Sequence, residues 1–428
     1  MNNHHSQPSS LWLSLFFVLS IAGCTTLGPA KPANNTPQEN KNSQPSRGHT
    51  LAQQLLIVDT HIDVPYRLFR KPEDISVATA SGQFDYPRAK LGGLNAPFMS
   101  VYIPAAVDEA GEAFSFANQT IDSLETLATN FSDKFAIATC TQDVYQQFER
   151  ALISLPMGME NGGPIDNKIK NLEHFYERGI RYITLTHSKS NHIGDSSYDS
   201  NEHWQGLSDF GKNLVSEMNR VGVMIDVSHV SDKAFWQVLE LSNTPVIASH
   251  SSLRHFTPGF HRNMSDKMVV ALAEAGGVIQ INYGSSFLTK AARDYSNARS
   301  AAVKAHRLAN HLPDRDPSLL TFMQQYTAAN PYPFATLEDV LDHIDRTVDL
   351  AGIDAVGIGS DYDGVGDTLP IDLKDVASFP NLVDGLLQRG YSETAIEKIL
   401  SGNVMRVWRA IEDYAATQGT KVLCRTQP

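Results

Sequence analysis

Histidines and carboxylates follow short apolar runs at several points along this sequence. The first apolar run is Leu55 to Val58, and His61 and Asp63 come directly after it. Unbroken apolar runs of this length are typical of parallel strands that are buried on both faces. The same pattern recurs along the chain, and the polar residues that end the runs are His61, Asp63, Glu160, His187, His229, His250, Asp361 and Asp363.

Imidazoles and carboxylates are ligands that zinc prefers in catalytic sites. Taken singly, each residue has an ordinary structural explanation: a His-x-Asp pair is more often a hydrogen-bonded structural pair, Glu160 could cap a helix, and His229 or His250 could be a satisfied core histidine. Together they favour a metal centre, because a buried carboxylate without a partner is costly. Five of them are the candidate ligands: the imidazoles of His61, His229 and His250 and the carboxylates of Asp63 and Glu160. One catalytic zinc ion uses only three protein ligands, so five ligands predict two Zn²⁺ ions.

The simplest arrangement uses all five residues. His61 and Asp63 bind one zinc ion, His229 and His250 bind the other, and Glu160 bridges the two. Two divalent ions carry more positive charge than two carboxylates and a bridging hydroxide neutralise. The excess would polarise a carbonyl and keep the hydroxide ionised near neutral pH.

Eight β-rich runs alternate with helical patterns and would position these residues. Helical segments such as 207–222 and 265–277 end at Gly, and several begin with Ser or Asp suited to capping. Eight βα units predict a (β/α)8 TIM barrel, an α/β fold whose chemistry lies at the carboxyl ends of the strands. No GxGxxG or P-loop follows a strand, which disfavours an open nucleotide-binding sheet. The runs are 55–63, 96–104, 153–161, 180–187, 223–229, 245–251, 277–283 and 355–363.

Three further features lie within or around the barrel. Residues 284–335 form a long insertion after strand seven, which we expect to be a lid or a dimer element. The run FAIATC, residues 135–140, is expected to add a ninth, peripheral strand. Cys140 ends that run and is expected to be a buried thiol, although it could pair with Cys424 in an oxidising compartment.

The N-terminus is expected to be a lipoprotein signal. Residues 11–23 form an apolar segment too short for a comfortable bilayer span, and Ile21 to Cys24 resemble a bacterial lipobox. The first ten residues lack Lys and Arg, so an ordinary cleaved signal peptide is the alternative. Lipidation of Cys24 would anchor the protein in a bacterial cell envelope, and Thr25 favours the outer membrane, facing the periplasm.

Composition sets the remaining limits. The 428 residues carry a net charge of -12, which argues against a nucleic-acid partner. Residues 25–48 are rich in Asn, Pro, Gln and Ser and are expected to be a flexible tether. The expected organisation is a lipoprotein signal peptide (1–24), the tether, the TIM barrel with its metal site (49–415) and a C-terminal tail (416–428).

These residues and the motifs around them resemble those of the membrane dipeptidases, also called renal or microsomal dipeptidases. Members of that family are dinuclear zinc peptidases of the metal-dependent hydrolase barrels. The match covers about residues 50–415, with the motifs in the family's order and spacing. The motifs are VDTHIDVPYRL, LGGLNAPFMSVYIP, GMENG, RYITLTHS, LSDFGKNLVSEMNRVGVMIDVSHVS, PVIASHSS, HRNMSD, VGIGSDYDGV and GNVMRVW.

The resemblance implies an activity and a set of roles. It implies a zinc-dependent dipeptidase, a dipeptide substrate, a homodimer, and zinc ligands at the five residues named above. His187 matches the substrate-binding histidine that stabilises the oxyanion, and Arg262 of HRN matches the arginine that holds the dipeptide's terminal carboxylate. Asp361 matches the aspartate that shuttles a proton to the leaving amine.

The chain departs from the family at two places expected near the mouth, which bear on substrate preference. Pro97 stands where Gln is common, and Asn161-Gly162-Gly163-Pro164 stands where Gly-Gly-His commonly follows the bridging Glu. The cysteine pairs of mammalian members are absent. Asp363 is expected to be structural, and the loop histidines without an assigned role are His192, His203, His255 and His261.

Two other classes of function remain open at this stage. The same barrel and metals would serve another amide or ester hydrolase, such as a deacetylase, a lactonase or a β-lactam-cleaving enzyme. The chain could also be a metal-dependent binding lipoprotein without turnover, which the presence of both His187 and Asp361 disfavours.

Overall fold

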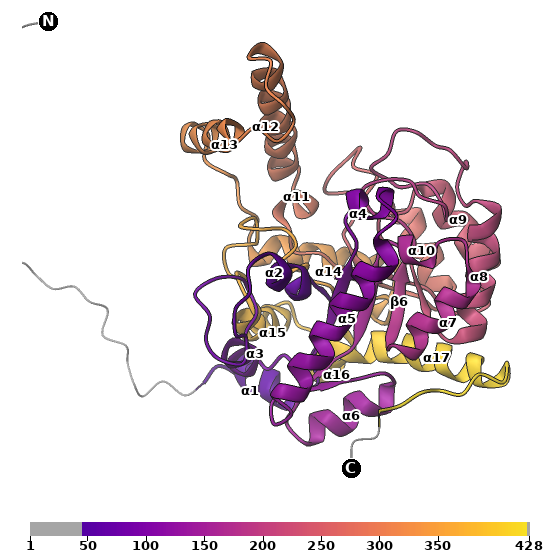
Figure 1. The fold of residues 1–428 in the computed structure, drawn as a ribbon. Coiled ribbons are helices and arrows are strands. Elements are labelled where there is room, and N and C mark those ends of the chain that lie inside the picture. Colours follow the sequence, from indigo (N-terminus) through magenta and orange to yellow (C-terminus); the bar gives the residue numbers. More distant parts are fainter. Residues whose placement is uncertain (1–44, 426–428) are drawn as a thin grey trace, which may run out of the picture. The chain divides into compact units, whose positions relative to one another are not determined.

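The fold is a nearly closed barrel of parallel strands surrounded by helices (Figure 1). The structure, a computed structural model, describes residues 45–425. Eight strands pair in the order β1-β2-β5-β6-β7-β8-β9-β10, which confirms the predicted α/β barrel. Their bounds are β1 Val58–Ile62, β2 Ala96–Tyr102, β5 Met157–Glu160, β6 Ile180–Thr184, β7 Met224–Asp226, β8 Ile247–Ser251, β9 Val278–Ile281 and β10 Val356–Ile358.

Helices follow the strands and cover the outside of the barrel. Ser208, Ser231 and Ser265 each accept a hydrogen bond from the first turn of the helix that they precede, as the capping pattern predicts. The helices are α1 Arg47–Gln54, α2 Val64–Arg70, α3 Tyr86–Gly92, α4 Ala105–Glu109, α5 Ala113–Asn130, α6 Thr141–Glu149, α7 Ile169–Glu177, α8 Asp209–Val221, α9 Asp232–Leu241, α10 Asp266–Glu274, α11 Ser285–Leu288, α12 Lys290–Ala309, α13 Ser318–Ala329, α14 Leu337–Ala351, α15 Phe379–Gln388, α16 Glu393–Glu397 and α17 Asn403–Thr417.

Two apolar clusters hold this arrangement together. The larger cluster packs the helices against the outer face of the strands. The smaller cluster fills the barrel interior with side chains such as Val58, Phe98 and Tyr182, and α17 adds Trp408, whose ring centroid is 5.2 Å from that of Phe98. The interior is therefore a packed core, and the site must lie at the other end of the strands.

The third predicted strand is two strands, so the prediction of a single strand over 153–161 is wrong. β4 (Ile153–Leu155) pairs with β3 (Phe135–Ile137) in a small separate sheet, which confirms a peripheral strand in the run FAIATC. β5 begins after Pro156 and joins the barrel between β2 and β6. Pro156 has no N–H group, which suits a break between the two strands.

The first and last strands are joined by residues next to their polar ends. Ile62 bridges to Tyr362, and the Asp63 N–H donates to the Tyr362 carbonyl at 2.8 Å. The Asp361 N–H donates to the His61 carbonyl at 3.0 Å. Closure of the barrel and placement of these polar residues therefore depend on the same hydrogen bonds.

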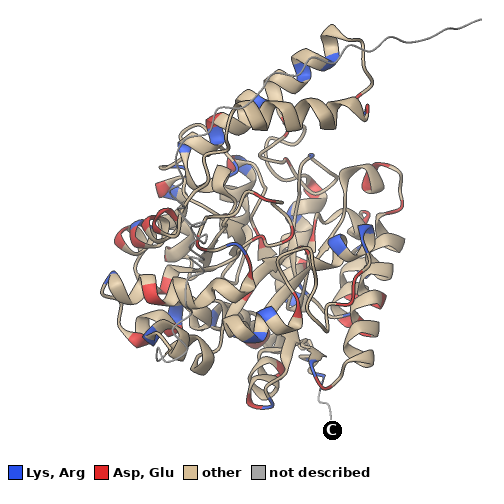
Figure 2. Ribbon diagram, turned by 90° about the vertical axis from the view of Figure 1, so that its left-hand side faces the viewer, with Lys and Arg blue, Asp and Glu red and all other residues tan. Residues whose placement is uncertain are grey.

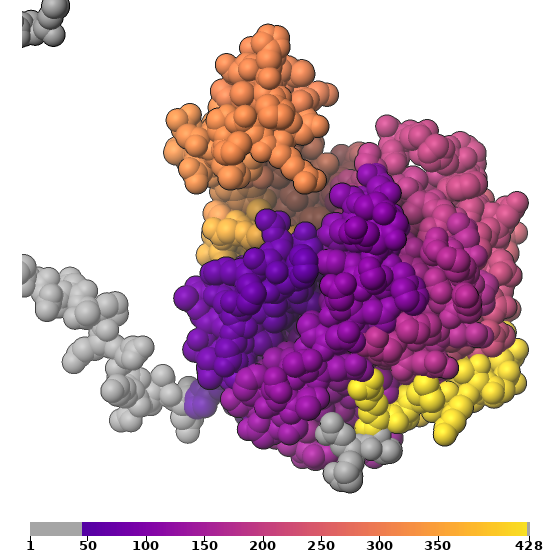
Figure 3. Space-filling view, in the orientation of Figure 1, coloured from indigo at the N-terminus to yellow at the C-terminus, as the bar shows by residue number. Residues whose placement is uncertain are grey.

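Helices α11 to α13 lie between β9 and α14. Figures 1 and 3 show α12 and α13 as an arm that projects from the barrel. The two helices pack on each other through pairs such as His306 and Phe322, whose ring centroids are 4.1 Å apart. Ala292 on α12 and Leu319 on α13 are the buried residues of the arm helices.

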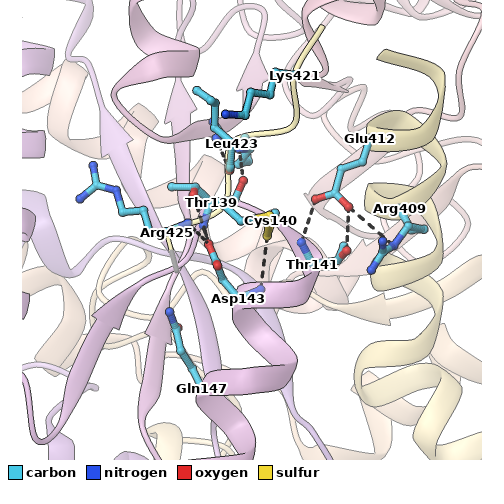
Figure 4. Close-up of a disulfide and its surroundings, with 12 residues drawn as sticks. Thr139, Cys140, Thr141, Asp143, Gln147, Arg409, Glu412, Lys421, Leu423 and Arg425 are labelled. Carbon is cyan, nitrogen blue, oxygen red and sulfur yellow. Dashed lines mark hydrogen bonds and ion pairs between the residues drawn. A yellow bond between two sulfur atoms is a disulfide. The ribbon is translucent and has the colours of Figure 1, made fainter. Parts of the chain in front are cut away.

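The structure corrects the prediction that Cys140 is a free thiol. Cys140 is buried, but it forms a disulfide with Cys424, with a Cα–Cα distance of 5.2 Å (Figure 4). The chain after α17 runs back along the barrel, where the Arg425 N–H donates to Asp143 at 2.9 Å. This return brings together two cysteines that are 284 positions apart.

We expect this disulfide to stabilise the fold, because it closes a long loop in the unfolded chain. Replacing both cysteines by Ser should lower the free energy of unfolding by about 2–4 kcal/mol. Thermal unfolding followed by circular dichroism would measure the loss. Reductant should lower the midpoint of the wild type and leave that of the double variant unchanged; a wild-type midpoint that ignores reductant contradicts the prediction.

Candidate metal centre

The polar residues predicted at the strand ends meet at one end of the barrel. The strands themselves place His61, Glu160 and His250, which lie in or at the end of β1, β5 and β8. The loops directly after β1, β6, β7 and β10 place the others. Side chains that converge in this way are His61, Asp63, Glu160, His187, His229, His250 and Asp361.

Glu160 lies at the centre of this cluster. Its Oε1 atom is 3.1 Å from His229 Nε2 and 3.2 Å from His250 Nε2. Its Oε2 atom is 3.6 Å from Nε2 of His61, which is itself 3.5 Å from Asp63 Oδ2. The two oxygens of one carboxylate therefore face two separate groups of side chains.

Side chains behind the imidazoles fix their orientation. The Tyr182 hydroxyl lies 2.8 Å from Nδ1 of His61. The Ser249 hydroxyl donates to Asp226 at 2.6 Å and lies 2.8 Å from Nδ1 of His250. Because that hydroxyl gives its proton to Asp226, it accepts one from Nδ1, and the lone pair of His250 is left on Nε2. Hydrogen bonds of this kind set the tautomer of metal-binding histidines.

Burial and neighbouring charges set the protonation of the cluster. Burial lowers the pKa of His229 and the pKa of His250 well below the usual histidine value. Burial opposes the charged form of Glu160, but the neighbouring His187 and His61 imidazoles prevail and hold the pKa of Glu160 well below its usual value. Neutral imidazoles and an ionised carboxylate are the forms that bind a divalent cation.

A second group of acidic atoms lies beside His61. Ligand atoms of His61, Asp63 and Asp361 all lie within 4.8 Å of one another. Without a cation, burial and the charge of Asp63 raise the pKa of Asp361 well above its usual value. Asn282 donates to Asp361 at 2.7 Å. A Cβ atom at Gly364 would lie 2.2 Å from an oxygen of each aspartate, so this close approach requires glycine.

Several site residues have a backbone conformation that side chains disfavour. His229 has φ of 68° and Asp361 has φ of 64°. Asn161, which follows Glu160, and Asp363, two residues after Asp361, also have positive φ, at 74° and 67°. Left-handed conformations of this kind persist at functional sites, where the surrounding structure enforces them.

The donor set fits divalent metal ions. Ligand atoms about 2.1 Å from a tetrahedral zinc ion lie roughly 3.4 Å from one another, and the distances around Glu160 run from 3.1 to 3.6 Å. His61 Nε2 and Asp63 Oδ1 are buried without a hydrogen-bond partner. The Nε2 atoms of His229 and His250 face each other at 2.9 Å. Cations between these groups would satisfy atoms that are otherwise costly to bury.

Comparison with known proteins agrees with this chemistry. Residues 46–422 match the family described as membrane dipeptidase, peptidase family M19. The chain belongs to the membrane dipeptidase family. This finding confirms the resemblance seen in the motifs, and the chain is a metallopeptidase of this dipeptidase type.

Individual members of the dipeptidase family align over most of the chain. Dipeptidase tcpJ of Claviceps purpurea is 33% identical over 345 residues, which are 79% of this chain and 71% of that protein. Dipeptidase 3 of Mus musculus is 30% identical over 365 residues, which are 83% of this chain and 64% of the mouse protein. The crystal structure of the probable dipeptidase PvdM from Pseudomonas aeruginosa superposes with a TM-score of 0.75 at 27% identity and covers 86% of this chain and 98% of its own.

A cavity of about 980 Å³ leads from the surface of this family member to the cluster. His187 lies on its wall, with Nε2 3.6 Å from Glu160 Oε1, and 21% of its side chain is exposed. That fraction is larger than for the other cluster histidines, which are 0 to 6% exposed. His187 is therefore the histidine of the cluster best placed to contact a bound molecule.

Arg262 lies beside the cluster, behind the cavity wall. Its Nη1 atom donates to the Ser251 hydroxyl and its Nη2 atom to the His250 carbonyl, both at 2.7 Å, while Nε is buried without a partner. Its guanidinium carbon lies 5.5 Å from the ring centroid of Phe287, which lines the cavity. Among the described residues that line the cavity, His187 and Asp361 are present and Arg262 is not.

The remaining predicted residues lie away from the centre of the cluster. Asp363 forms an ion pair with Arg67 at 2.9 Å and accepts a hydrogen bond from the Gln83 N–H, so its role is structural. Pro97 is at the amino end of β2, so the prediction that it lies near the mouth is wrong. Half-buried His192 lines a separate small pocket, and the exposed loop histidines are His203, His255 and His261.

Sequence analysis missed the residues that support the ligands. Asn282 is next to last in the run GVIQINY and directly follows β9, so it carries the same strand-end signal as the other polar residues. Tyr182 and Ser249 had no such signal, because they lie inside their strands. Tyr182 reaches His61 across Gly158, where a Cβ atom would lie 1.9 Å from the tyrosine ring.

We expect His229→Ala to lower the metal content of the purified protein, because it removes one of the imidazoles that face Glu160. Turnover should fall at least about 100-fold. Elemental analysis and a dipeptide hydrolysis assay would measure the two effects. The matched control is His203→Ala at an exposed histidine, which should change neither; wild-type metal content in the His229 variant contradicts the assignment.

Proposed function

We propose that the chain is a zinc-dependent dipeptidase with two Zn²⁺ ions per subunit. The observation that carries this proposal is the placement of Glu160, whose two oxygens face two groups of candidate ligands. His61 and Asp63 would hold one ion, His229 and His250 the other, and Glu160 would bridge them. Ions held there would polarise the scissile carbonyl and activate a water molecule as the nucleophile.

His187 and Arg262 would bind the substrate. The partly exposed His187 ring lies on the cavity wall. There its Nε2 atom is able to donate a hydrogen bond to the oxyanion that develops on the carbonyl. Burial lowers the pKa of His187, so the neutral ring acts as a hydrogen-bond donor and not as a cation. The unpaired Nε of Arg262 would complete the recognition of the dipeptide's terminal carboxylate.

Asp361 would carry the proton. It lies on the cavity wall beside Asp63, and Asn282 holds one of its oxygens. Its other oxygen is free to take a proton from the attacking water and to deliver it to the departing amine nitrogen. Without a cation, burial and the Asp63 charge raise the pKa of Asp361, and a raised pKa makes its carboxylate a stronger base toward the attacking water.

A dipeptide library tests the proposed function. The purified protein should hydrolyse L,L or L,D dipeptides, lose the activity with a chelator, and recover it with zinc, because the buried ligands need the ion for catalysis. Release of free amino acids measures the reaction, and elemental analysis measures the number of ions. Cleavage of lactones, acetylated amines or β-lactams without cleavage of any dipeptide would overturn the proposal.

We expect Arg262→Lys to raise KM for dipeptides by about tenfold, because a lysine lacks the Nε–H group that the bonded guanidinium leaves free for the carboxylate. Dipeptide amides lack that carboxylate, so their KM should stay the same. The kinetic constants of matched pairs, such as Ala-Ala and Ala-Ala-amide, would measure the difference. An unchanged preference for dipeptides over amides refutes this role of Arg262.

We also propose that a lipid on Cys24 anchors the protein in the outer membrane, facing the periplasm. Cys24 lies outside the described residues. Within residues 45–425, no helix is both long and apolar enough to cross a bilayer. The Cys140–Cys424 disulfide supports an oxidising compartment such as the periplasm. Cys24→Ala should release the protein from the membrane fraction, and continued membrane association would refute the anchor.

We also propose a homodimer, which the resemblance implies. The arm of α12 and α13 would form either the dimer interface or a lid over the cavity. The arm stands away from the barrel, and its helices bury only Ala292 and Leu319 among residues 45–425. Light scattering on the purified protein would measure the oligomeric state, and a monomer at all concentrations would exclude the dimer.

A further inference from the structure

The cavity is larger than a small dipeptide needs. At about 980 Å³, it lies at the upper end of the range for pockets that hold drug-sized ligands. Its inner part is the proposed zinc centre. Its outer part is lined by α2, by α12 and by the loop after β10, and Figure 3 shows the recess below the projecting arm. Groups of the substrate beyond the scissile bond would lie in this outer part.

Positive side chains line the outer part. They are Arg67, Arg70 and Lys71 from α2 and its C-cap, and Arg299 from α12. We call this outer part of the cavity the rim, and these four side chains the rim cations. Arg67 is neutralised by Asp363 and by Glu73, at 2.9 and 2.8 Å.

The two other arginines differ from Arg67 in that they lack such partners. Lys71 shares Glu73 at 3.3 Å, whereas the ion pairs of residues 45–425 include neither Arg70 nor Arg299. Arg70 and Arg299 are also the rim cations without a hydrogen bond to another described side chain or carbonyl.

The carboxylates of the cavity do not cancel this charge. Asp63 and Glu160 would be neutralised by the proposed zinc ions, Asp361 belongs to the proton path, and Asp363 is paired with Arg67. The rim is therefore positive in a chain whose net charge is -12.

Helix α12 contributes to the same imbalance. It carries Lys290, Arg293, Arg299, Lys304 and Arg307 against a single acidic residue, Asp294. Figure 2 shows blue segments along the projecting helices, whereas red segments are prominent on the helices around the barrel. A positive patch over a cavity attracts anionic substrates and raises their local concentration.

We propose that Arg70 and Arg299 form a subsite for an additional carboxylate on the substrate, so that acidic dipeptides are the preferred class. The inference rests on the proposed dipeptidase function. The dipeptide's own terminal carboxylate is assigned to Arg262, so the rim binds a second one, from a Glu or Asp side chain. Guanidinium groups suit this ligand, because they form charge-assisted hydrogen bonds with carboxylates.

The wall between the zinc centre and the rim suits the connecting part of such a substrate. Tyr66 and Tyr102 line it with an edge-to-face contact of 5.0 Å between ring centroids. Tyr102 also packs against the His187 ring at 4.8 Å. Aromatic faces accept the methylene groups of a side chain whose charged end continues to the arginines.

The test compares acidic dipeptides with their amide isosteres. The zinc-loaded wild type should cleave Glu-Ala or Ala-Glu with a kcat/KM about tenfold higher than that for Gln-Ala or Ala-Gln, the order expected for one charge-assisted hydrogen bond. The two pairs distinguish which residue of the dipeptide reaches the rim. The advantage should shrink as salt concentration rises, since exposed charges are screened.

Variants separate the subsite from general charge effects. Arg70→Gln with Arg299→Gln should bring the acid-to-amide ratio close to one, and Arg70→Glu with Arg299→Glu should invert the preference toward Lys-Ala or Ala-Lys. Lys304→Gln is the matched control, because Lys304 is an exposed cation of α12 outside the cavity lining. It should keep the wild-type ratio.

Two outcomes would overturn the inference. One is a wild type that cleaves acidic and amide dipeptides equally well, which leaves the dipeptidase function intact. The other is a preference for acidic dipeptides that survives in both double variants. Failure to cleave any dipeptide, with zinc bound, would instead refute the proposed function itself.

Discussion

The structure depends on placing several ionisable groups where water cannot solvate them. Glu160 is 3% exposed, and His61, His229 and His250 around it are 0, 5 and 1% exposed. An isolated charge in such a place is unstable, so every member needs a neighbour of opposite character or a cation. Parallel strands in a closed barrel meet this need, because their carboxyl ends bring residues from distant parts of the chain to one point. The hydrogen bonds between His61 and Asp361 and between Asp63 and Tyr362 join barrel closure to site assembly.

The barrel could be predicted because its strands are short apolar runs with polar ends. Burial on both faces removes polar alternation, and the helices between the strands begin at recognisable serine caps. The break between β4 and β5 was hidden because apolar residues stand on both sides of Pro156. The Cys140–Cys424 disulfide was predicted only as an alternative, for a different reason. It depends on the path of the chain after α17, and no local pattern fixes that path.

The site could be predicted to the extent that its residues stand at strand ends. Glu160 and the histidines around it meet this condition, and the structure brings them together. Residues that act through others gave a weaker signal or none. Tyr182 contacts His61 only because Gly158 leaves room, and no sequence pattern marks the left-handed backbone of His229. Arg262 illustrates the limit, since the sequence cannot show that its Nη atoms are already bonded within the protein.

Helix α2 connects the two ends of the cavity as a single rigid body. Its N-cap is Asp63, a candidate zinc ligand, and its last residue is Arg70 at the outer rim. Seven helical residues span about 10 Å. The length of the helix therefore sets the distance between the reacting carbonyl and the second carboxylate of a substrate that reaches Arg70. A protein built in this way would select its substrates by length as well as by charge.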